Sequence, residues 1–103
     1  MASIKIICTN PGENDSTIIF DEILRFHENY EKDHKELIVE LSNEIAVDNK
    51  LAALASGSIN EIILTEGEDI IILTEYTEVK MINKIYYGNG TASKTRLQFE
   101  NKY

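Results

Sequence analysis

The sequence predicts an α+β domain made mostly of antiparallel β-strands. Short stretches rich in β-branched residues recur along the chain, and glycine-containing turn sequences separate many of them. Only one segment has the composition and end signals of a clear helix. We expect a meander of about five to seven strands with one short packed helix over Asp48–Ser56, in a single domain over residues 1–103. A second helix within Phe20–Glu31 is left open.

The first segments are predicted strands joined by turns. Ser3–Thr9 is rich in β-branched residues, and Asn10-Pro11-Gly12 ends it because proline has no N–H for a ladder and glycine permits a turn. A second strand is expected to open at Thr17. The stretch Phe20–Tyr30 fits a helical period, but a period of two keeps its three aromatic side chains on one face.

Glu36–Ser42 is a cleaner strand, because apolar residues alternate with mostly polar ones. The segment Asp48–Ser56 is the best helix. Asp48 is expected to accept hydrogen bonds from the first free N–H groups, and strong helix formers follow it. Gly57 stands where a left-handed residue often ends a helix. A helix this short must pack on the sheet to be stable.

The remaining chain resembles a meander of hairpins. Ile59–Thr65 and Ile70–Tyr76 flank Glu66–Asp69, a four-residue connection with a glycine. Ile70–Leu73 is apolar without interruption, which predicts a central strand covered on both faces.

Two more strands complete the predicted meander. Val79–Tyr87 is expected to end at the turn sequence Gly88-Asn89-Gly90. In the last strand, Thr95, Leu97 and Phe99 alternate with polar residues, which predicts one buried and one exposed face.

Composition excludes several classes of protein. The formal charge of −8, from 18 acidic and 10 basic side chains, favours solubility and makes direct nucleic-acid binding improbable, because that needs a cationic face. The single cysteine, Cys8, excludes an intramolecular disulfide, and we expect it to be buried in its strand. The N-terminus lacks a signal-peptide pattern, and no window is apolar enough for a membrane helix. We therefore expect a protein that is kept in a reducing cytoplasm or is assembled there into something larger.

The residues that could carry chemistry do not form a known motif. His27, Glu31 and His34 would share one side of a helix, but seven residues span about 10 Å, which is too far for one ion without further ligands. Cys8 lies in an apolar strand, and Ser56-Gly57-Ser58 is better explained as a helix end than as a nucleophile turn. We predict no enzymatic activity, no metal site and no cofactor.

Charge is distributed unevenly over the second half of the chain. Between Ile59 and Val79 every charged side chain is acidic: Glu61, Glu66, Glu68, Asp69, Glu75 and Glu78. From Lys80 onward five side chains are basic and only Glu100 is acidic. Adjacent strands of opposite sign can pair across a sheet. Alternatively, unlike ends suit head-to-tail stacking of copies.

The stacking hypothesis supplies interface candidates in the last hairpin: Lys80, Lys84, Tyr86, Lys94 and Arg96. Reversing Lys94 and Arg96 to glutamate is predicted to disrupt assembly with little effect on the stability of the monomer.

The stretch from Asp48 onward also carries a resemblance. Its order of a short helix, a hairpin, the joint Thr74–Val79 and a final hairpin, with an Ile/Lys/Asn/Glu-rich composition, is similar to small structural or accessory proteins encoded by phages and prophages of low-GC bacteria. The resemblance implies a virion- or tail-associated component, or a small intracellular effector made during infection. We predict the first of these, a non-enzymatic structural or assembly protein. It would act through protein–protein contacts, as a homo-oligomer or as a component of a larger assembly.

The alternative is a small acidic inhibitor of a host or defence protein that imitates the charge of nucleic acid. The segments Asp21–Glu44 and Glu61–Glu78 would then carry the negative surface. Binding of this kind weakens steeply with salt.

Overall fold

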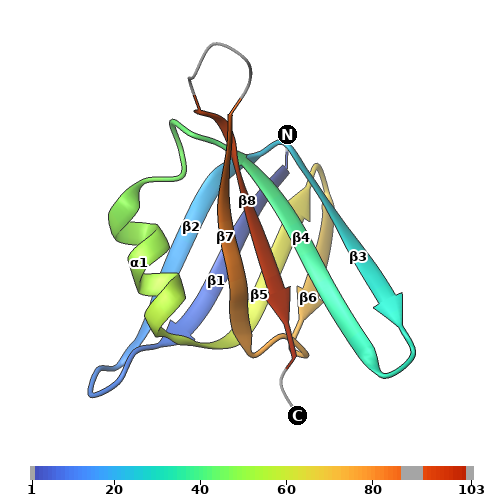
Figure 1. Cartoon of the computed structure of the whole chain (residues 1–103). Coiled ribbons are helices and arrows are strands. Elements are labelled where there is room, and N and C mark those ends of the chain that lie inside the picture. Colours follow the sequence, from blue (N-terminus) through green and yellow to red (C-terminus); the bar gives the residue numbers. More distant parts are fainter. Residues whose placement is uncertain (1, 87–91, 102–103) are drawn as a thin grey trace.

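The computed structural model describes residues 2–86 and 92–101, which form eight strands and one helix (Figure 1). In chain order the elements are β1 (Ala2–Thr9), β2 (Asp15–Ile23), β3 (Arg25–Glu31), β4 (His34–Ser42), α1 (Asp48–Ser56), β5 (Ser58–Glu66), β6 (Asp69–Leu73), β7 (Glu78–Tyr86) and β8 (Ala92–Glu100). The predicted α+β class with mainly antiparallel strands is confirmed. The predicted turn at residues 88–90 lies outside the described residues.

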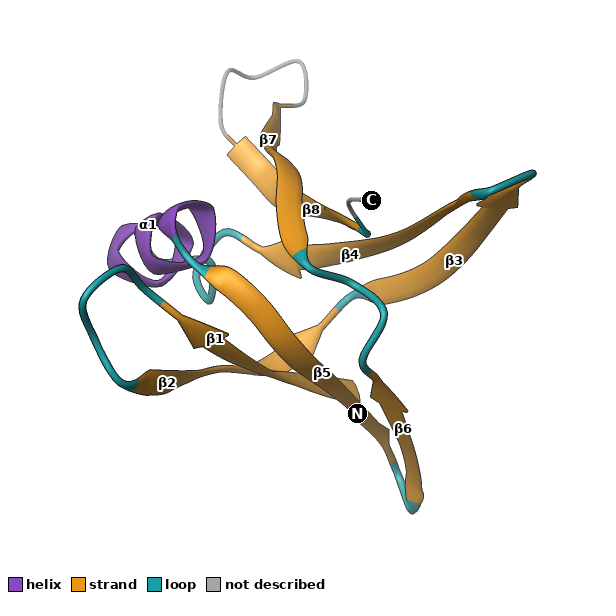
Figure 2. Cartoon of the chain, turned by 90° about the horizontal axis from the view of Figure 1, so that it is seen from below, coloured by secondary structure: helices purple, strands orange, loops and turns teal. Residues whose placement is uncertain are grey.

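The strands form two antiparallel sheets. The first has the order β2-β1-β5-β6 and the second the order β3-β4-β8-β7. Figure 2 shows the sheets as two layers, with α1 at one side and the ends of β3 and β6 at the opposite side. The four strands that follow α1 are thus divided between the sheets, because the chain changes layer between β6 and β7.

The core lies between the two layers and is built from alternate residues of the strands. In β1 these are Ile4, Ile6 and Cys8, which are fully buried as a period of two requires. The second sheet supplies buried residues in the same way: Leu37, Val39, Leu41, Thr95, Leu97 and Phe99. Leu51 and Leu54 are the buried residues of α1, so the helix packs on the sheets as the sequence predicted.

The stretch Phe20–Glu31 contains no helix. It consists of the end of β2, a corner at Leu24, and β3. The register of β2 against β1 shifts between Phe20 and Ile23, so one extra residue interrupts the alternation. This β-bulge turns Ile23 into the core and leaves Leu24 exposed, which explains why neither period fitted the sequence throughout.

The ends of α1 differ from the sequence prediction. Asp48 is the first helical residue, whereas Val47 occupies the cap position and its carbonyl accepts hydrogen bonds from the N–H groups of Lys50 and Leu51. Gly57 is extended, with φ −98°, and does not form a left-handed stop. A Cβ on Gly57 would lie 2.5 Å from Oδ1 of the Asn10 side chain and 3.1 Å from the carbonyl oxygen of Ala53, so a larger residue there would require both neighbours to shift.

Two backbone junctions link the layers. At the corner between β2 and β3, the N–H of Leu24 donates to the carbonyl of Glu40, at 2.8 Å. In the connection between β6 and β7, Thr77 accepts from the N–H of Ile59 at 2.8 Å and donates to the carbonyl of Glu100 at 3.0 Å. Thr77 therefore joins β5 of the first sheet to β8 of the second.

Candidate functional site

The most unusual surface of the molecule is an isoleucine edge, formed by Ile70, Ile71 and Ile72 in β6. Their side chains are 65%, 43% and 59% exposed. β6 pairs with β5 on one side only and is the last strand of its sheet. The predicted central strand, covered on both faces, is therefore wrong. β6 lies at the edge of its sheet, and no layer of the described residues covers it.

Pairing with β5 explains the exposure of each residue. Ile70 lies opposite Thr65 and Ile72 opposite Ile63, so both point away from the core. Ile71 lies opposite buried Leu64, so its side chain points to the inner face of the sheet. Since Ile71 is nevertheless exposed, the second sheet does not cover this part of β6. The strand is apolar on both faces and covered on neither.

The isoleucine edge continues onto the outer face of the first sheet. Ile63 and Lys5 are directly opposite each other in β5 and β1, and Ile19 of β2 lies opposite Lys5 on its other side. Ile63 and Ile7 are half-buried, and Ile19 is exposed. The ammonium group of Lys5 makes no ion pair with the described residues. Glu61 lies opposite Ile7 on the same face, so Lys5 and Glu61 are charged residues among apolar side chains that contact solvent.

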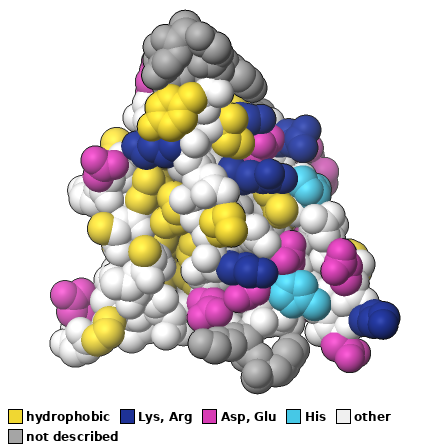
Figure 3. Space-filling view, in the orientation of Figure 1, with side chains coloured by type: hydrophobic (Ala, Val, Ile, Leu, Met, Phe, Trp, Pro, Cys, Tyr) yellow, Lys and Arg dark blue, Asp and Glu magenta, His cyan; other side chains and the backbone are white. Residues whose placement is uncertain are grey.

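The outer face of the second sheet has the opposite character. Acidic, basic and histidine side chains are intermixed over β4, β7 and β8 in Figure 3. Glu40 is only 4% exposed, and its carboxylate lies 2.7 Å from Nε of Arg25 and 2.9 Å from Nζ of Lys94. The hydrogen bond from Lys94 is the main reason that the pKa of Glu40 is lowered from its ordinary value of 4.5. The charges on this face neutralise one another within the chain.

A second charged group lies at the other end of the same face. Nε2 of His34 is 2.8 Å from Oε1 of Glu36 and 3.8 Å from Oε2 of Glu100. Nζ of Lys80 lies 3.8 Å and 3.6 Å from the same two oxygens. The hydrogen bond with His34 is the main cause that lowers the pKa of Glu36 from its ordinary value.

This group has the donor types of a metal site, since one imidazole nitrogen and two carboxylate oxygens lie within 4.8 Å of one another. However, the ammonium group of Lys80 already supplies a positive charge to both carboxylates, and a divalent ion would have to displace it. The sequence considered His27, Glu31 and His34 instead. That set is not brought together, because His27 and His34 lie on different strands and His27 is opposite Ile38.

The three lysines among the predicted interface residues of the last hairpin form ion pairs within the chain. Lys80 contacts Glu36 and Glu100, Lys94 contacts Glu40, and Nζ of Lys84 is 3.7 Å from Asp48. Tyr86 is exposed. Arg96 is half-buried opposite Glu40. Reversing Lys94 and Arg96 to glutamate would place acids beside the buried Glu40, so we now expect this change to destabilise the monomer itself.

The six acidic residues of the alternative hypothesis do not form one surface. Glu66, Glu68 and Asp69 are exposed at the β5–β6 turn, which spans Gly67 and Glu68. Glu61 lies in β5, Glu78 lies in β7 of the other sheet, and Glu75 forms an ion pair with Lys35. Cross-strand pairing of this acidic segment with the basic hairpin is also not what the structure shows. Lys80, Lys84 and Lys94 of this hairpin form ion pairs with other residues instead: Glu36, Glu40, Glu100 and Asp48.

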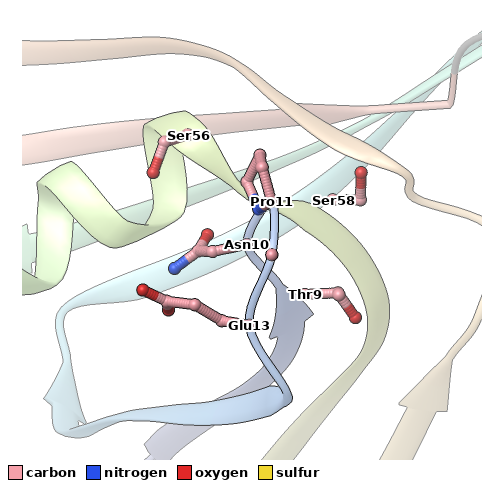
Figure 4. Close-up of a pocket in the computed structure, with 7 residues that line it drawn as sticks. Thr9, Asn10, Pro11, Glu13, Ser56 and Ser58 are labelled. Carbon is pink, nitrogen blue, oxygen red and sulfur yellow. The ribbon is translucent and has the colours of Figure 1, made fainter.

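The surface also has two hollows. One, of about 380 Å³, is formed by the β1–β2 turn and the residues around the end of α1, and Figure 4 shows Asn10, Glu13 and Ser56 at it. The hydroxyl of Ser56 donates to the carbonyl of Ala52 at 3.0 Å, and not to a base as nucleophilic catalysis requires. The other hollow, of about 650 Å³, is lined by the four consecutive residues 31–34 of the β3–β4 turn and borders the charged group at His34.

No family model, curated protein or solved structure matches this chain. Among residues 2–86 and 92–101, no helix has the length and apolar character needed to cross a bilayer. The isoleucine edge is therefore the candidate site. The sequence pattern predicts that these isoleucines are buried in a central strand. The acidic turn directly before them is the signal in the sequence that indicates an edge strand.

Proposed function

We propose that this chain is a non-enzymatic structural or assembly protein that acts through protein–protein contacts. The observation that carries the proposal is the isoleucine edge, in which three consecutive apolar side chains are exposed on a strand with a free side. Natural proteins normally protect such edges with charges, proline or a covering element, because an open edge invites pairing with another strand. An unprotected apolar edge is typical of a strand that has a partner.

The energies involved agree with a contact surface. Covering the exposed half of one isoleucine contributes about 1 kcal/mol, since full burial of such a side chain is worth about 1.5–3 kcal/mol. Three residues on each of two partners would then contribute about 6 kcal/mol. Association costs about 4–15 kcal/mol in lost freedom. The edge alone would thus support weak binding, and stable assembly needs the neighbouring apolar side chains, such as Ile63, as well.

A virion- or tail-associated role in a phage or prophage agrees with this mode of action. Repeated contacts through a sheet edge are a simple way to build a particle from small copies, and the element order after Asp48 supports the same assignment. The protein would then act in the bacterial host cytoplasm during assembly, or within the finished particle.

An acidic inhibitor is the second candidate. The observation that favours it is the group Glu66, Glu68 and Asp69, which is exposed at one turn. The dispersal of the other three acidic residues makes this the weaker candidate, because mimicry of nucleic acid requires negative charge over an extended surface.

Mass measurement in solution tests the proposal. The full-length chain is examined by native mass spectrometry and by light scattering over concentrations from about 1 to about 500 μM, a range chosen for the weak association expected from these energies. We expect a defined multimer, formed by the chain alone or with a product of its neighbouring genes. The proposal is overturned if the chain stays monomeric at every concentration, both alone and when mixed with the products of its neighbouring genes.

A further inference from the structure

We infer that the isoleucine edge binds the same edge of a second copy, so that β6 pairs antiparallel with β6 of that copy about a two-fold axis at Ile71. This inference rests on the proposed function and names its first partner. The product is a dimer in which two four-stranded sheets join into one continuous sheet of eight strands.

The pattern of the strand is complementary to itself. An antiparallel pair centred on Ile71 places Ile71 opposite Ile71, and Ile70 opposite Ile72 of the second copy. Each exposed isoleucine therefore meets an isoleucine on the same face, both on the outer side and on the inner side of the sheet. Contacts about a two-fold axis require a surface that matches itself in this way.

Charge selects the antiparallel arrangement. Glu66, Glu68 and Asp69 lie at one end of β6 and carry no basic neighbour in sequence. A parallel pair would bring the two acidic turns side by side. The antiparallel pair places Glu68 opposite Thr74 of the second copy, so the two Glu68 residues are roughly 20 Å apart. At this separation salt largely screens the repulsion between them.

The other end of β6 is less acidic than the turn. The same register, continued past Leu73, places Gly67 near Glu75, whose carboxylate is held by the ammonium group of Lys35. Lys35 is also 3.5 Å from Glu28, so this end carries two carboxylates and one ammonium group. Reversing one copy therefore brings the acidic turn against the less negative end of its partner.

The other edge strands of the described sheets are poorer candidates. β2 has exposed acidic residues at Asp15, Asp21 and Glu22, and β3 has polar residues over most of its length. β7 lies beside α1 (Figure 1), and Lys80 and Lys84 interrupt its apolar side chains. Among these four strands, only β6 has three consecutive exposed apolar residues.

Disulfide trapping tests the register. In the proposed pair the Cα atoms of the two Ile71 residues lie about 5 Å apart, within the range for a disulfide. We expect Ile71→Cys to form a covalent dimer with oxidised glutathione, seen on a non-reducing gel. Ile70→Cys alone should give little, because two residues at position 70 would be roughly 8 Å apart. An equimolar mixture of Ile70→Cys and Ile72→Cys should give the mixed dimer.

The unmodified chain is the control for this experiment, since its Cys8 is fully buried and should not form a disulfide-linked dimer. Failure of Ile71→Cys to dimerise overturns the inference. Efficient dimers of Ile70→Cys alone also overturn it, because they indicate a parallel or shifted pair. If the unmodified chain still forms multimers in either case, the proposed function stands and only the assigned edge is wrong.

A matched pair of lysine substitutions gives an independent measurement. Ile71→Lys places a charge at the centre of the pair, and we expect its dimer dissociation constant to rise about tenfold or more. Met81→Lys changes a residue of nearly equal exposure in β7 of the other sheet, 44% against 43%, and should leave the constant unchanged. Circular dichroism confirms that both variants are folded. Equal effects of the two substitutions contradict the inference.

Discussion

Tyr76 is the largest of the fully buried side chains in the described part of the chain. It lies in the connection between β6 and β7, and its hydroxyl donates to Oε2 of Glu28 at 2.6 Å. Burial raises the pKa of Tyr76, and the hydrogen bond to Glu28 raises it further, so the hydroxyl is protonated at neutral pH and donates to the carboxylate. Lys35 lies beside both groups, with Nζ 3.5 Å from Glu28 and 5.9 Å from the centre of the Tyr76 ring.

Removing this hydroxyl tests its contribution. We expect Tyr76→Phe to lower the free energy of unfolding by about 1–2 kcal/mol, because the ring still fills its site but the carboxylate of Glu28 loses a buried donor. Urea denaturation measures the change. Tyr86→Phe is the matched control, since Tyr86 is exposed and its hydroxyl should contribute almost nothing.

Glu40 gives the protein a defined sensitivity to acid. Its pKa is lower in the folded chain than its ordinary value of 4.5, so the folded state binds this proton less readily than the unfolded state. The resulting stabilisation is complete above about pH 4.5 and is lost as the pH falls through the folded value. Its physical source is the contact with Lys94 and Arg25, which favours the charged carboxylate.

We expect Glu40→Gln to lower the free energy of unfolding at pH 7 by about 2 kcal/mol, because charged hydrogen bonds are lost while Lys94 keeps its charge. The variant should also show a weaker loss of stability between pH 5 and pH 3 than the unmodified chain. Urea denaturation at a series of pH values gives both quantities. Glu44→Gln, at an exposed turn position, should change neither. An unchanged pH profile in Glu40→Gln would contradict this assignment.

At the scale of elements, α1 depends on its packing. The helix has nine residues, too few to be stable alone in water. Leu54 is fully buried and belongs to the core, so we expect Leu54→Ala to lower the free energy of unfolding by about 3 kcal/mol. Leu24→Ala removes the same atoms from the exposed corner between β2 and β3 and should cost less than about 1 kcal/mol. Thermal denaturation of the two variants provides the comparison.

The elements differ in how well the sequence predicted them. The bounds of α1 and the alternation in β1 and β8 follow directly from local patterns of apolar residues, and the structure confirms them. In β4 the predicted alternation is not seen in the burial, because Ile38 and Glu40 are buried as well as Leu37, Val39 and Leu41. β2 and β3 could not be resolved because the bulge before Ile23 breaks the period of two, and a bulge is fixed by pairing with another strand. β6 was misplaced for a related reason. A run of isoleucines looks the same whether its cover comes from its own chain or from another molecule.

At the scale of the whole molecule, the net charge of −8 opposes association of two copies. Salt screens this repulsion but does not weaken an apolar contact. We therefore expect the dimer dissociation constant to fall when sodium chloride is raised from about 20 to about 300 mM, as measured by sedimentation. An acidic inhibitor bound to a basic partner would show the opposite trend, so the direction of the change separates the two candidate functions.

Only part of the candidate site could be predicted from the sequence, because the rest depends on how the strands are ordered across the whole molecule. Charge counts along the sequence suggested unlike ends, but Lys80, Lys84 and Lys94 find their partners on β4, α1 and β8. Such neutralisation depends on which strands become neighbours, and the order β3-β4-β8-β7 is not encoded in any local pattern. The apolar edge was visible as composition, whereas its exposure follows from sheet order.

The backbone of Thr77 bridges the two layers, and this bridge bears on how the molecule opens. Because the carbonyl of Thr77 accepts from Ile59 and its N–H donates to Glu100, the two sheets cannot separate without breaking one of these hydrogen bonds. The Thr77 amide should therefore exchange its hydrogen with solvent deuterium only through global unfolding, at a rate close to that of the slowest core amides. Faster exchange at Thr77 than at Ile6 or Leu97 would reveal that the two layers part before either one melts.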